Sequence, residues 1–518
     1  MPLFLIGFMA AGKTSVGRAL AAATGRRFVD LDDAIAATGV SVQELVARDE
    51  RAFREVEAKT LGTLLTADAV VATGGGAATF GDNLERMRAA GLVVALGVDA
   101  GEARRRAAGG PARPLLSNAE ALAVERAPIY RRAHAVVSTM GKSIDEVVSH
   151  VKHVERVFAS LRARDANAGT TIVALGERSY AVVTTAAIDR ALVMSQLGSP
   201  SKIAVITDRN VARHHAFAAD ETIVIEPGEA SKSFAKYEQL SSELVERGLD
   251  RASAIVALGG GVVGDLAGFV ASTLYRGIPI VQLPTTLVAM TDAAIGGKTA
   301  IDLPAGKNLV GAFWQPRLVA CATDTLATLP ARERRAGFGE LWKYALLDGR
   351  ALWDAVAACA AWAAGPDGVA PPPRELKQVI DRSIAFKAEI VGRDEREVTG
   401  QRALLNLGHT VGHAIESASG MLHGEAVALG LVAACRVSAA VLGTRDLSQE
   451  VSAALASSGL PADPSPWFTD EVLAGVKVDK KRIGANLRFI AVREVGACEP
   501  IEIAVTDLSR ILRPVAGA

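Results

Sequence analysis

Residues 402–430 read RALLNLGHTVGHAIESASGMLHGEAVALG and contain three of the eight histidines in the chain. His409 and His413 are four positions apart, so on a helix they project from one face, and His423 follows after a Gly-Met-Leu turn. Imidazole nitrogens suit zinc, and a catalytic zinc needs three protein ligands with a fourth position open to substrate. The stretch therefore indicates a helical metal site. Packed or capping histidines are the alternative, and the rest of the chain has to decide between the two.

The composition sets the broad class of protein. The chain has 518 residues, and a prior of about 150 residues per domain predicts two to four domains. Lys plus Arg equal Asp plus Glu at 57 each, so the overall charge does not favour nucleic-acid binding. No run approaches the roughly 18 apolar residues of a membrane span, and the start of the chain does not have the order of a secretory signal. The four cysteines form no CxxC pair, which favours a reducing cytoplasm.

The start of the chain carries a phosphate-binding pattern. Residues 3–8, LFLIGF, are a predicted buried strand that leads into GFMAAGKT, residues 7–14, and then into a helical pattern. This order matches G-x-x-x-x-G-K-T in the strand-to-helix context that it requires. Backbone amides of such a loop, with Gly7 and Gly12, cradle phosphates, while Lys13 and Thr14 serve the outer phosphates and magnesium. A chance match in a Gly- and Ala-rich chain is the alternative.

Acidic, basic and glycine positions follow this loop in order. Asp30 and Asp32 are two apart at the end of a short predicted strand and project the same way, so one can accept a hydroxyl proton while the other orients magnesium water. Solvated turn acids are the alternative. Further along come Arg54 in FREVE, three glycines after AVVAT, Arg113 in GGPARPLL and Arg131 in PIYRR. Taken singly, each arginine suits a solvated surface charge.

Together these motifs resemble shikimate kinase, a small P-loop kinase with a parallel sheet covered by helices on both faces. The resemblance spans residues 1–150 and implies ATP with Mg²⁺ as cofactor. It implies that Asp32 binds the shikimate 3-hydroxyl as the base and that Asp30 lies near magnesium. The implied shikimate contacts are Arg54, Gly75, Gly76 and Arg131. The implied lid residue over ATP is Arg113. One departure is Ala10, where the family usually has Gly.

The second half alternates short β-rich runs with helical patterns from about residue 170. Such βα alternation predicts a parallel sheet with a nucleotide site at the carboxyl ends of its strands. The turn GGGVVGD, residues 259–265, follows a predicted strand and opens a helix, so its amides could meet a pyrophosphate. We expect a kinase domain over 1–160, a linker over 161–170, an α/β domain over 171–329 and a helical domain over 330–518. No long Pro/Ser-rich linker separates the halves, which favours packed domains.

Polar residues then gather on glycine-rich turns. Asp292 comes first, and Lys298, Lys307 and Asn308 follow on glycine-rich turns. These three cationic or amide side chains suit a phosphorylated small molecule, because glycine lets the backbone approach the ligand. Beyond residue 330 the pattern becomes helical, and Glu340 is a candidate third ligand that would complete a His₂Glu zinc site. Amphipathic surface helices explain these charges equally well one motif at a time.

Residues 171–500 resemble 3-dehydroquinate synthase. The resemblance rests on an ordered set of motifs: GGGVVGDLAGF, PTTL, GGKTAID, GKNLVGAFWQP, GELWK, NLGHTVGHAIE and HGEAVALG. The resemblance implies an NAD-binding α/β half, an all-helical metal half, and chemistry in the cleft between them. The implied reaction converts 3-deoxy-D-arabino-heptulosonate 7-phosphate to 3-dehydroquinate and phosphate, with NAD recycled and Zn²⁺ or Co²⁺ bound. Ala293 and Ala294 depart from the Ser-Ser that is frequent in the family.

The resemblance also assigns residues by role. The implied metal ligands are Glu340, His409 and His423. The implied substrate-phosphate contacts are Lys298, Asn308, Arg402 and a C-terminal lysine, Lys480 or the adjacent Lys481, with Arg276 reaching in from a neighbouring subunit. The residues implied around the substrate ring, several of them catalytic, are Asp292, Lys343, Lys387, Asn406 and His413. The implied NAD contacts are Asp208, Asn210, Glu229, Lys232, Gly261, Asp265, Thr285, Thr286 and Lys307.

The sequence thus predicts a bifunctional cytoplasmic enzyme of the shikimate pathway, dimeric through its second half, that acts on small molecules and binds neither nucleic acid nor membrane. Two rival interpretations remain. The second half could be another metal- and NAD-dependent enzyme, such as a glycerol dehydrogenase or a different sugar-phosphate cyclase. The kinase half could be a non-catalytic nucleotide-sensing or assembly module, although Asp32 beside an intact loop argues against this.

Overall fold

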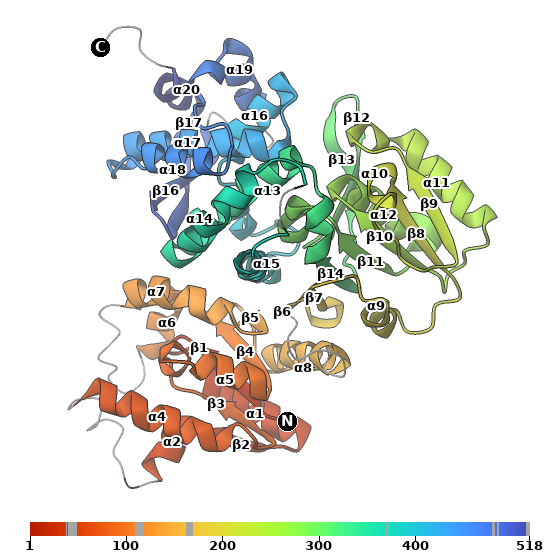
Figure 1. The fold of residues 1–518 in the computed structure, drawn as a ribbon. Helices are drawn as coiled ribbons and strands as arrows, with labels where there is room; N and C mark the ends of the chain where they lie inside the picture. Colours follow the sequence, from red (N-terminus) through yellow and green to blue (C-terminus); the bar gives the residue numbers. More distant parts are fainter. Residues whose placement is uncertain are drawn as a thin grey trace. The chain divides into compact units, whose positions relative to one another are not determined.

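The computed structural model describes residues 1–37, 39, 49–108, 119–161, 169–368, 371–478, 482–483 and 486–513. They form two compact units, Met1–Ala181 with Ala388–Arg393 and Val182–Lys387 with Asp394–Ala518, and each unit is described by itself (Figure 1). The domain boundaries expected from the sequence stay predictions. Most of the expected linker, residues 162–168, lies outside the described residues.

The first unit contains a parallel sheet in the order β2-β3-β1-β4-β5-β6. Its strands are β1 (Leu3–Gly7), β2 (Arg27–Asp30), β3 (Ala69–Ala72), β4 (Leu92–Gly97), β5 (Ala135–Ser138) and β6 (Gly169–Val173). Its helices are α1 (Lys13–Thr24), α2 (Leu31–Ala36), α4 (Glu50–Leu64), α5 (Asn83–Ala90), α6 (Ala100–Ala107), α7 (Ala119–Arg131) and α8 (Ile144–Leu161). The predicted strand–loop–helix start is therefore present.

The central strand β1 explains why helices cover both faces of this sheet. Successive side chains of a strand point to opposite faces. Leu3 and Leu5 join the core under α1 and α8, whereas Phe4 and Ile6 join the core on the other face. All four side chains are fully buried, so the strand needs a helical layer on each side. The carboxyl end of β1 then opens directly into the glycine loop.

The second unit begins with a run of sheet strands in the order β7-β14-β11-β10-β8-β9. Its strands are β7 (Tyr180–Thr185), which starts in the first unit, β8 (Ile203–Asp208), β9 (Glu221–Ile225), β10 (Ala254–Gly259), β11 (Ile280–Pro284) and β14 (Leu318–Ala322). Its helices are α9 (Arg190–Leu197), α10 (Arg209–Ala212), α11 (Phe234–Glu246) and α12 (Gly261–Thr273). An antiparallel hairpin, β12 (Lys298–Leu303) with β13 (Gly306–Phe313), precedes β14. The βα alternation predicted from the sequence is confirmed.

The remainder of the second unit is mainly helical, as expected from about residue 330. Its helices are α13 (Ala331–Asp348), α14 (Arg350–Ala364), α15 (Arg374–Arg393, whose last six residues belong to the first unit), α16 (His409–Ser419), α17 (His423–Leu442), α18 (Ser448–Ser457), α19 (Asp470–Val478) and α20 (Val505–Leu512). The expectation of an all-helical half needs one correction. A small antiparallel sheet lies before α20 and consists of β15 (Arg482–Ile483), β16 (Asn486–Glu494) and β17 (Ala497–Ala504).

Among the described residues, one helix, α17, is long and apolar enough to cross a membrane, and 67% of its apolar window is buried inside the protein. The burial has a local cause. A Cβ on Gly430 would lie 1.9 Å from the carbonyl oxygen of Gly408, which precedes α16. A Cβ on Gly424 would lie 1.7 Å from the carbonyl oxygen of Ala336 in α13. The backbone of α17 therefore touches the backbones of both neighbouring segments, which only glycine permits.

These contacts predict that Gly430→Ala destabilises the second unit. The added methyl group would collide with backbone that cannot rotate away, and overpacking of this kind costs about 1–3 kcal/mol or more. Chemical unfolding followed by tryptophan fluorescence should show the loss, because all five tryptophans lie beyond residue 313. A suitable control is Gly475→Ala on α19, where the new Cβ would have no neighbour nearer than 3.4 Å. Equal stability of the two variants would contradict the close-contact interpretation.

Candidate active sites

The glycine loop of the first unit borders a cavity of about 730 Å³. The loop residues 9–16 line it together with Asp30, Asp32, Thr73, Gly74 and Gly75. Lys13 donates from Nζ to the carbonyl oxygens of Gly7 and Phe8, both at 2.9 Å. Thr14 donates from Oγ1 to Asp30 Oδ2 at 2.8 Å, so the two predicted magnesium-side residues are already in contact. Ala10 has φ 57°, a conformation that favours glycine, which explains the family preference at this position.

Asp32 faces this cavity at the start of α2. Asp30 caps that helix and accepts a hydrogen bond from the Asp32 amide at 3.1 Å. Burial raises the pKa of the Asp32 carboxyl, and the neighbouring Asp30 raises it further. A carboxylate with a raised pKa is a stronger base, and this one lines the same cavity as the phosphate-binding loop.

The predicted shikimate residues Arg54, Gly75 and Gly76 also lie together. Arg54 is ion-paired with Glu57 at 2.8 Å, and its guanidinium lies so close to Gly76 that a Cβ there would be 2.3 Å from it. Glu57 is fully buried, and its Oε1 has no hydrogen-bond partner among the described residues. Glu57 belongs to the FREVE segment, and a Cβ on Gly74, which lines the cavity, would lie 2.5 Å from its Oε1.

The structure offers a different arginine from the one predicted at this site. Arg126 on α7 is buried, and its guanidinium would lie 3.8 Å from a Cβ on Gly75. Tyr130 on the same helix donates to the Gly75 carbonyl at 2.6 Å. Arg131 is five residues beyond Arg126, which turns it by about 140° around the helix. Arg131 instead donates from Nε to Glu389 Oε2 at 2.5 Å. Arg126 is therefore the arginine beside Gly75, and the sequence motifs did not single it out.

In the second unit, the predicted nucleotide residues meet at one edge of the sheet. The three strands β8, β10 and β11 are neighbours in the sheet. Asp208 ends β8, Gly261 starts the helix after β10, and Thr285 and Thr286 follow β11. Lys232 lies beside this edge, with Nζ 2.9 Å from Asp265 and 3.2 Å from Glu229. Burial raises the pKa of Asp265 to about 6 although Lys232 opposes the shift. Asn210 belongs to α10, directly after Asp208 and Arg209.

The predicted phosphate contacts are only partly brought together. Lys298 Nζ lies 2.5 Å from Glu397, and Arg402 Nε lies 3.6 Å from the same carboxylate oxygen. Asn308 is elsewhere, because Lys298 pairs with Phe313 across the hairpin, roughly 15 Å along the strand from Asn308. Asn308 instead accepts a hydrogen bond from Lys232. Arg276 is exposed and has φ 68°.

Three of the predicted ring residues, Asp292, Lys343 and Lys387, form one charged cluster. Asp292 is in a π-helical turn, Ala289–Ala293, a rare feature that is frequent at functional sites. Its carboxylate lies 2.7 Å from Lys387 Nζ and 3.7 Å from Lys343 Nζ. Burial lowers the pKa of Lys387 to about 8 despite the neighbouring carboxylate. Asn406 ends the short 3-10 turn Gln401–Asn406 just before α16.

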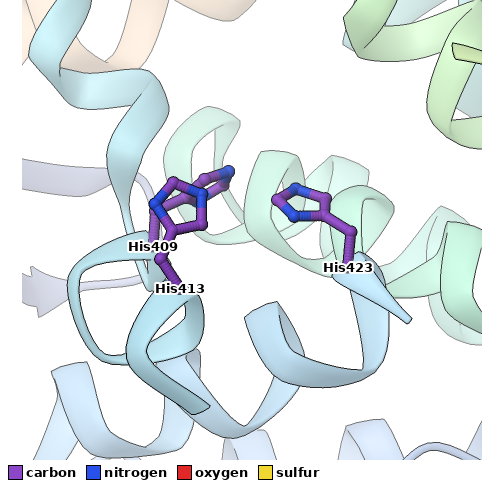
Figure 2. Close-up of side chains that lie close together, drawn as sticks. All are labelled: His409, His413 and His423. Carbon is purple, nitrogen blue, oxygen red and sulfur yellow. The ribbon is translucent and has the colours of Figure 1, made fainter. Parts of the chain in front are cut away.

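The histidine cluster lies where α16 and α17 begin. Figure 2 shows His409 and His413 together on α16, with His423 facing them from α17. One ligand atom from each of the three histidines lies within 4.8 Å of the others. Glu340 from α13 is fully buried beside them, with Oε1 3.2 Å from His423 Nε2 and 3.5 Å from His409 Nε2. His409 is buried, whereas His413 is exposed.

The donor set fits a zinc-type ion. Both oxygens of Glu340 lack a hydrogen bond of normal geometry among the described residues, although Oε2 is ion-paired with Lys343. Bonds of about 2.05 Å at tetrahedral angles separate two ligand atoms by about 3.3 Å, close to both Glu340–histidine distances. Burial holds the pKa of His409 well below its usual range, which keeps that imidazole neutral as a ligand must be. Burial would also lower the pKa of His423, but the neighbouring carboxylates of Glu340 and Glu416 outweigh it and raise the pKa to about 10.

Two expectations cannot be compared with the structure. Arg113 falls in residues 109–118, and Lys480 with Lys481 falls in residues 479–481, and all of these lie outside the described residues.

The two folds and their sites define two enzyme classes in one chain. The first unit has the parallel sheet and phosphate-binding loop of a P-loop kinase. The second has an open parallel sheet with a glycine turn at its carboxyl edge, followed by helices that present two imidazoles and a carboxylate.

Comparison with known proteins gives the families. Residues 9–155 match the shikimate kinase family, and residues 222–336 and 337–482 match the N-terminal and C-terminal parts of 3-dehydroquinate synthase. The 3-dehydroquinate synthase of Caulobacter vibrioides is 45% identical over 350 residues, which cover 63% of this chain and 93% of that protein. That of Lactiplantibacillus plantarum is 44% identical over 321 residues, covering 60% and 87%. The chain therefore belongs to the 3-dehydroquinate synthase family and carries a shikimate kinase domain in front of it.

A solved structure supports the fold of the second unit. A 2-deoxy-scyllo-inosose synthase, complexed with carbaglucose-6-phosphate, NAD⁺ and Co²⁺, has a TM-score of 0.57 and 25% identity, covering 66% of this chain and 99% of that one. At 25% identity, this protein is a more distant relative than the 3-dehydroquinate synthases above, which are 44–45% identical. The higher identities favour the 3-dehydroquinate synthase interpretation over the rival cyclase.

The position of Arg126 predicts that Arg126→Ala weakens shikimate binding more than Arg131→Ala. A hydrogen bond to a charged group contributes about 1.5–3 kcal/mol, so kcat/KM for shikimate should fall about 10- to 100-fold for the first variant, mainly through KM. Arg131→Ala is the matched control on the same helix and should change the value less than threefold. A larger effect at Arg131 would support the sequence-based assignment instead.

The ligand geometry predicts different outcomes for two histidines one helix apart. His423→Ala should lose bound metal, because it removes a nitrogen that faces Glu340, whereas His413→Ala should retain the metal and lose reaction rate. Metal content per chain after dialysis, measured by mass spectrometry, separates the two results. Loss of metal from His413→Ala with retention by His423→Ala would reverse the ligand assignment.

Proposed function

We propose that the first unit transfers the terminal phosphoryl group of MgATP to the 3-hydroxyl of shikimate. Asp32 accepts the hydroxyl proton, and its raised pKa makes it a better base than an ordinary aspartate. Lys13 and the loop amides hold the phosphates, Thr14 and Asp30 face the magnesium, and Arg54 with Arg126 bind the shikimate carboxylate. The contact between Thr14 and Asp30 beside the Asp32-lined cavity supports this assignment most directly.

We also propose that the second unit converts 3-deoxy-D-arabino-heptulosonate 7-phosphate to 3-dehydroquinate. The chemistry supplied by the bound groups is polarisation of the substrate hydroxyl by a divalent metal and reversible hydride transfer by NAD. Glu340, His409 and His423 would hold the metal, and the residues at the carboxyl edge of the sheet would hold NAD. The solved cyclase that contains NAD⁺ and Co²⁺ supports both groups. The two oxygens of Glu340 facing three basic groups are the observation that carries this proposal.

The protein residues around the substrate have separable tasks. Lys298 and Arg402 bind the substrate phosphate as a pair of cations near one another. Asp292, Lys343 and Lys387 surround the ring, and the lowered pKa of Lys387, caused by burial, lets it exchange a proton near neutral pH. His413 is exposed to solvent, whereas His409 is buried, and this suits a contact of His413 with substrate rather than with metal.

Cellular location and assembly are further parts of the proposal. All four cysteines are free, and three of them are buried, which suits a reducing cytoplasm. A homodimer through the second unit would let Arg276, which is exposed, reach the phosphate site of a partner. Both families act on small molecules, so neither a nucleic acid nor a membrane is needed as partner.

The two-site proposal predicts that Asp32→Asn removes one activity and spares the other. ATP-dependent phosphorylation of shikimate should fall at least about 100-fold, the usual worth of a general base, while phosphate release from the heptulosonate phosphate with NAD and zinc stays unchanged. Asp33→Asn is the matched control, because that side chain is exposed.

The same assay checks the metal. Chelation should stop phosphate release and leave the kinase reaction intact once magnesium is restored. Loss of both activities in Asp32→Asn would overturn the two-site proposal, and phosphate release that survives chelation would overturn the metal assignment.

A further inference from the structure

Glu416 is a carboxylate with no role in the proposed reaction. It lies on α16, two helical turns beyond His409, and its side chain is 12% exposed. Its two oxygens have different partners. Oε2 lies 3.0 Å from His423 Nδ1, and Oε1 accepts a hydrogen bond from Lys307 Nζ at 2.7 Å. One side chain thus connects a candidate metal ligand with the β12–β13 hairpin.

The contact with His423 fixes which ring nitrogen is available. A carboxylate accepts hydrogen bonds and does not donate them when ionised, so Nδ1 of His423 carries the proton. Nε2, the atom that faces Glu340 at 3.2 Å, is then the nitrogen left to bind a metal ion. His409 is oriented in the same manner, since its Nδ1 lies 3.0 Å from the Leu407 carbonyl. The two imidazoles differ in that one is held by a backbone carbonyl and the other by a charged side chain.

The contact with Lys307 extends this link to the nucleotide edge. Lys307 is the second residue of β13, and the next residue, Asn308, has φ 55° and accepts a hydrogen bond from Lys232. Lys232 in turn contacts Asp265 and Glu229 at the carboxyl edge of the sheet. The tip of the hairpin is therefore attached on one side to Glu416 and on the other to the residues expected to contact NAD.

We propose that Glu416 is a positioning residue that orients His423 for the metal and, through Lys307, holds the hairpin tip against the metal-bearing helices. The inference rests on the proposed metal site. Carboxylates that hold a metal-binding histidine raise its basicity and fix its ring, and their removal lowers metal affinity about 10- to 100-fold. Glu416 contacts the ring nitrogen of His423 that faces away from Glu340, so its effect should appear in metal affinity and geometry before it appears in reaction rate.

The test uses the full chain and cobalt as the probe. The metal-free protein is titrated with Co²⁺, and the dissociation constant and the visible absorption of the bound ion are measured. Glu416→Gln, which keeps the size and one acceptor, should weaken binding about 10-fold, and Glu416→Ala, which keeps neither, about 100-fold with a changed absorption spectrum. Glu425→Gln is the matched control, because Glu425 is two residues from His423 but pairs with Arg332, and it should bind Co²⁺ within threefold of wild type.

A second measurement tests the link to the hairpin. Hydrogen exchange over residues 298–313 should become faster in both Glu416→Ala and Lys307→Met, and Lys307→Met should still bind Co²⁺ within threefold of wild type. Wild-type affinity and an unchanged spectrum in both Glu416 variants would overturn the inference. A wild-type chain that binds no Co²⁺ would instead overturn the metal site of the proposed function, so the two failures are distinguishable.

Discussion

The metal-bearing half depends on direct contact between helix backbones. At Gly430 and Gly424, α17 lies against the segment before α16 and against α13, at distances that leave no room for a Cβ. Helices with ordinary side chains at these points would be held 8–10 Å apart or more, since side chains set the interaxial distance. The glycines instead bring the first turn of α17 to the middle of α13. His423 and Glu340 meet because of this contact, and neither residue could create it.

A cluster of charge lies beside this contact and would destabilise the protein if its charges were unpaired. Glu340 and Lys343 are fully buried, and Lys387 is nearly so, with Asp292 between the two ammonium groups. Two carboxylates and two ammonium groups balance in number, so each charge has a partner. Lys387 and Lys343 hold the pKa of Asp292 well below its usual range although burial acts in the other direction. Tyr344 completes the set by donating to Asp292 at 2.9 Å.

The sequence predicts features that depend on residues close together in the chain, and it misses those that depend on tertiary contacts. The glycine loop, the alternation along β1 and the pairing of His409 with His413 are local patterns, and the structure has all three. Arg126 was missed because the choice between it and Arg131 depends on which side of α7 faces Gly75, a tertiary relation. Glu416 is seven residues from His409 on the same helix face, and this spacing alone places its carboxylate on the side of the histidines. The separation of Lys298 from Asn308 follows from the hairpin register, which glycine-rich turns do not reveal.

The two units bind anions by different physical means, and this difference shapes how each site can discriminate. In the first unit the loop and the start of α1 line the cavity, and backbone amides at such a helix start bind phosphate with few side-chain charges. In the second, Lys298 and Arg402 are side-chain cations whose charge is already shared with Glu397, a residue with φ 58°. A phosphate that binds there exchanges with a carboxylate rather than with water alone. The net gain is then smaller than two bare cations would give, and a doubly charged phosphate has the advantage over any singly charged competitor.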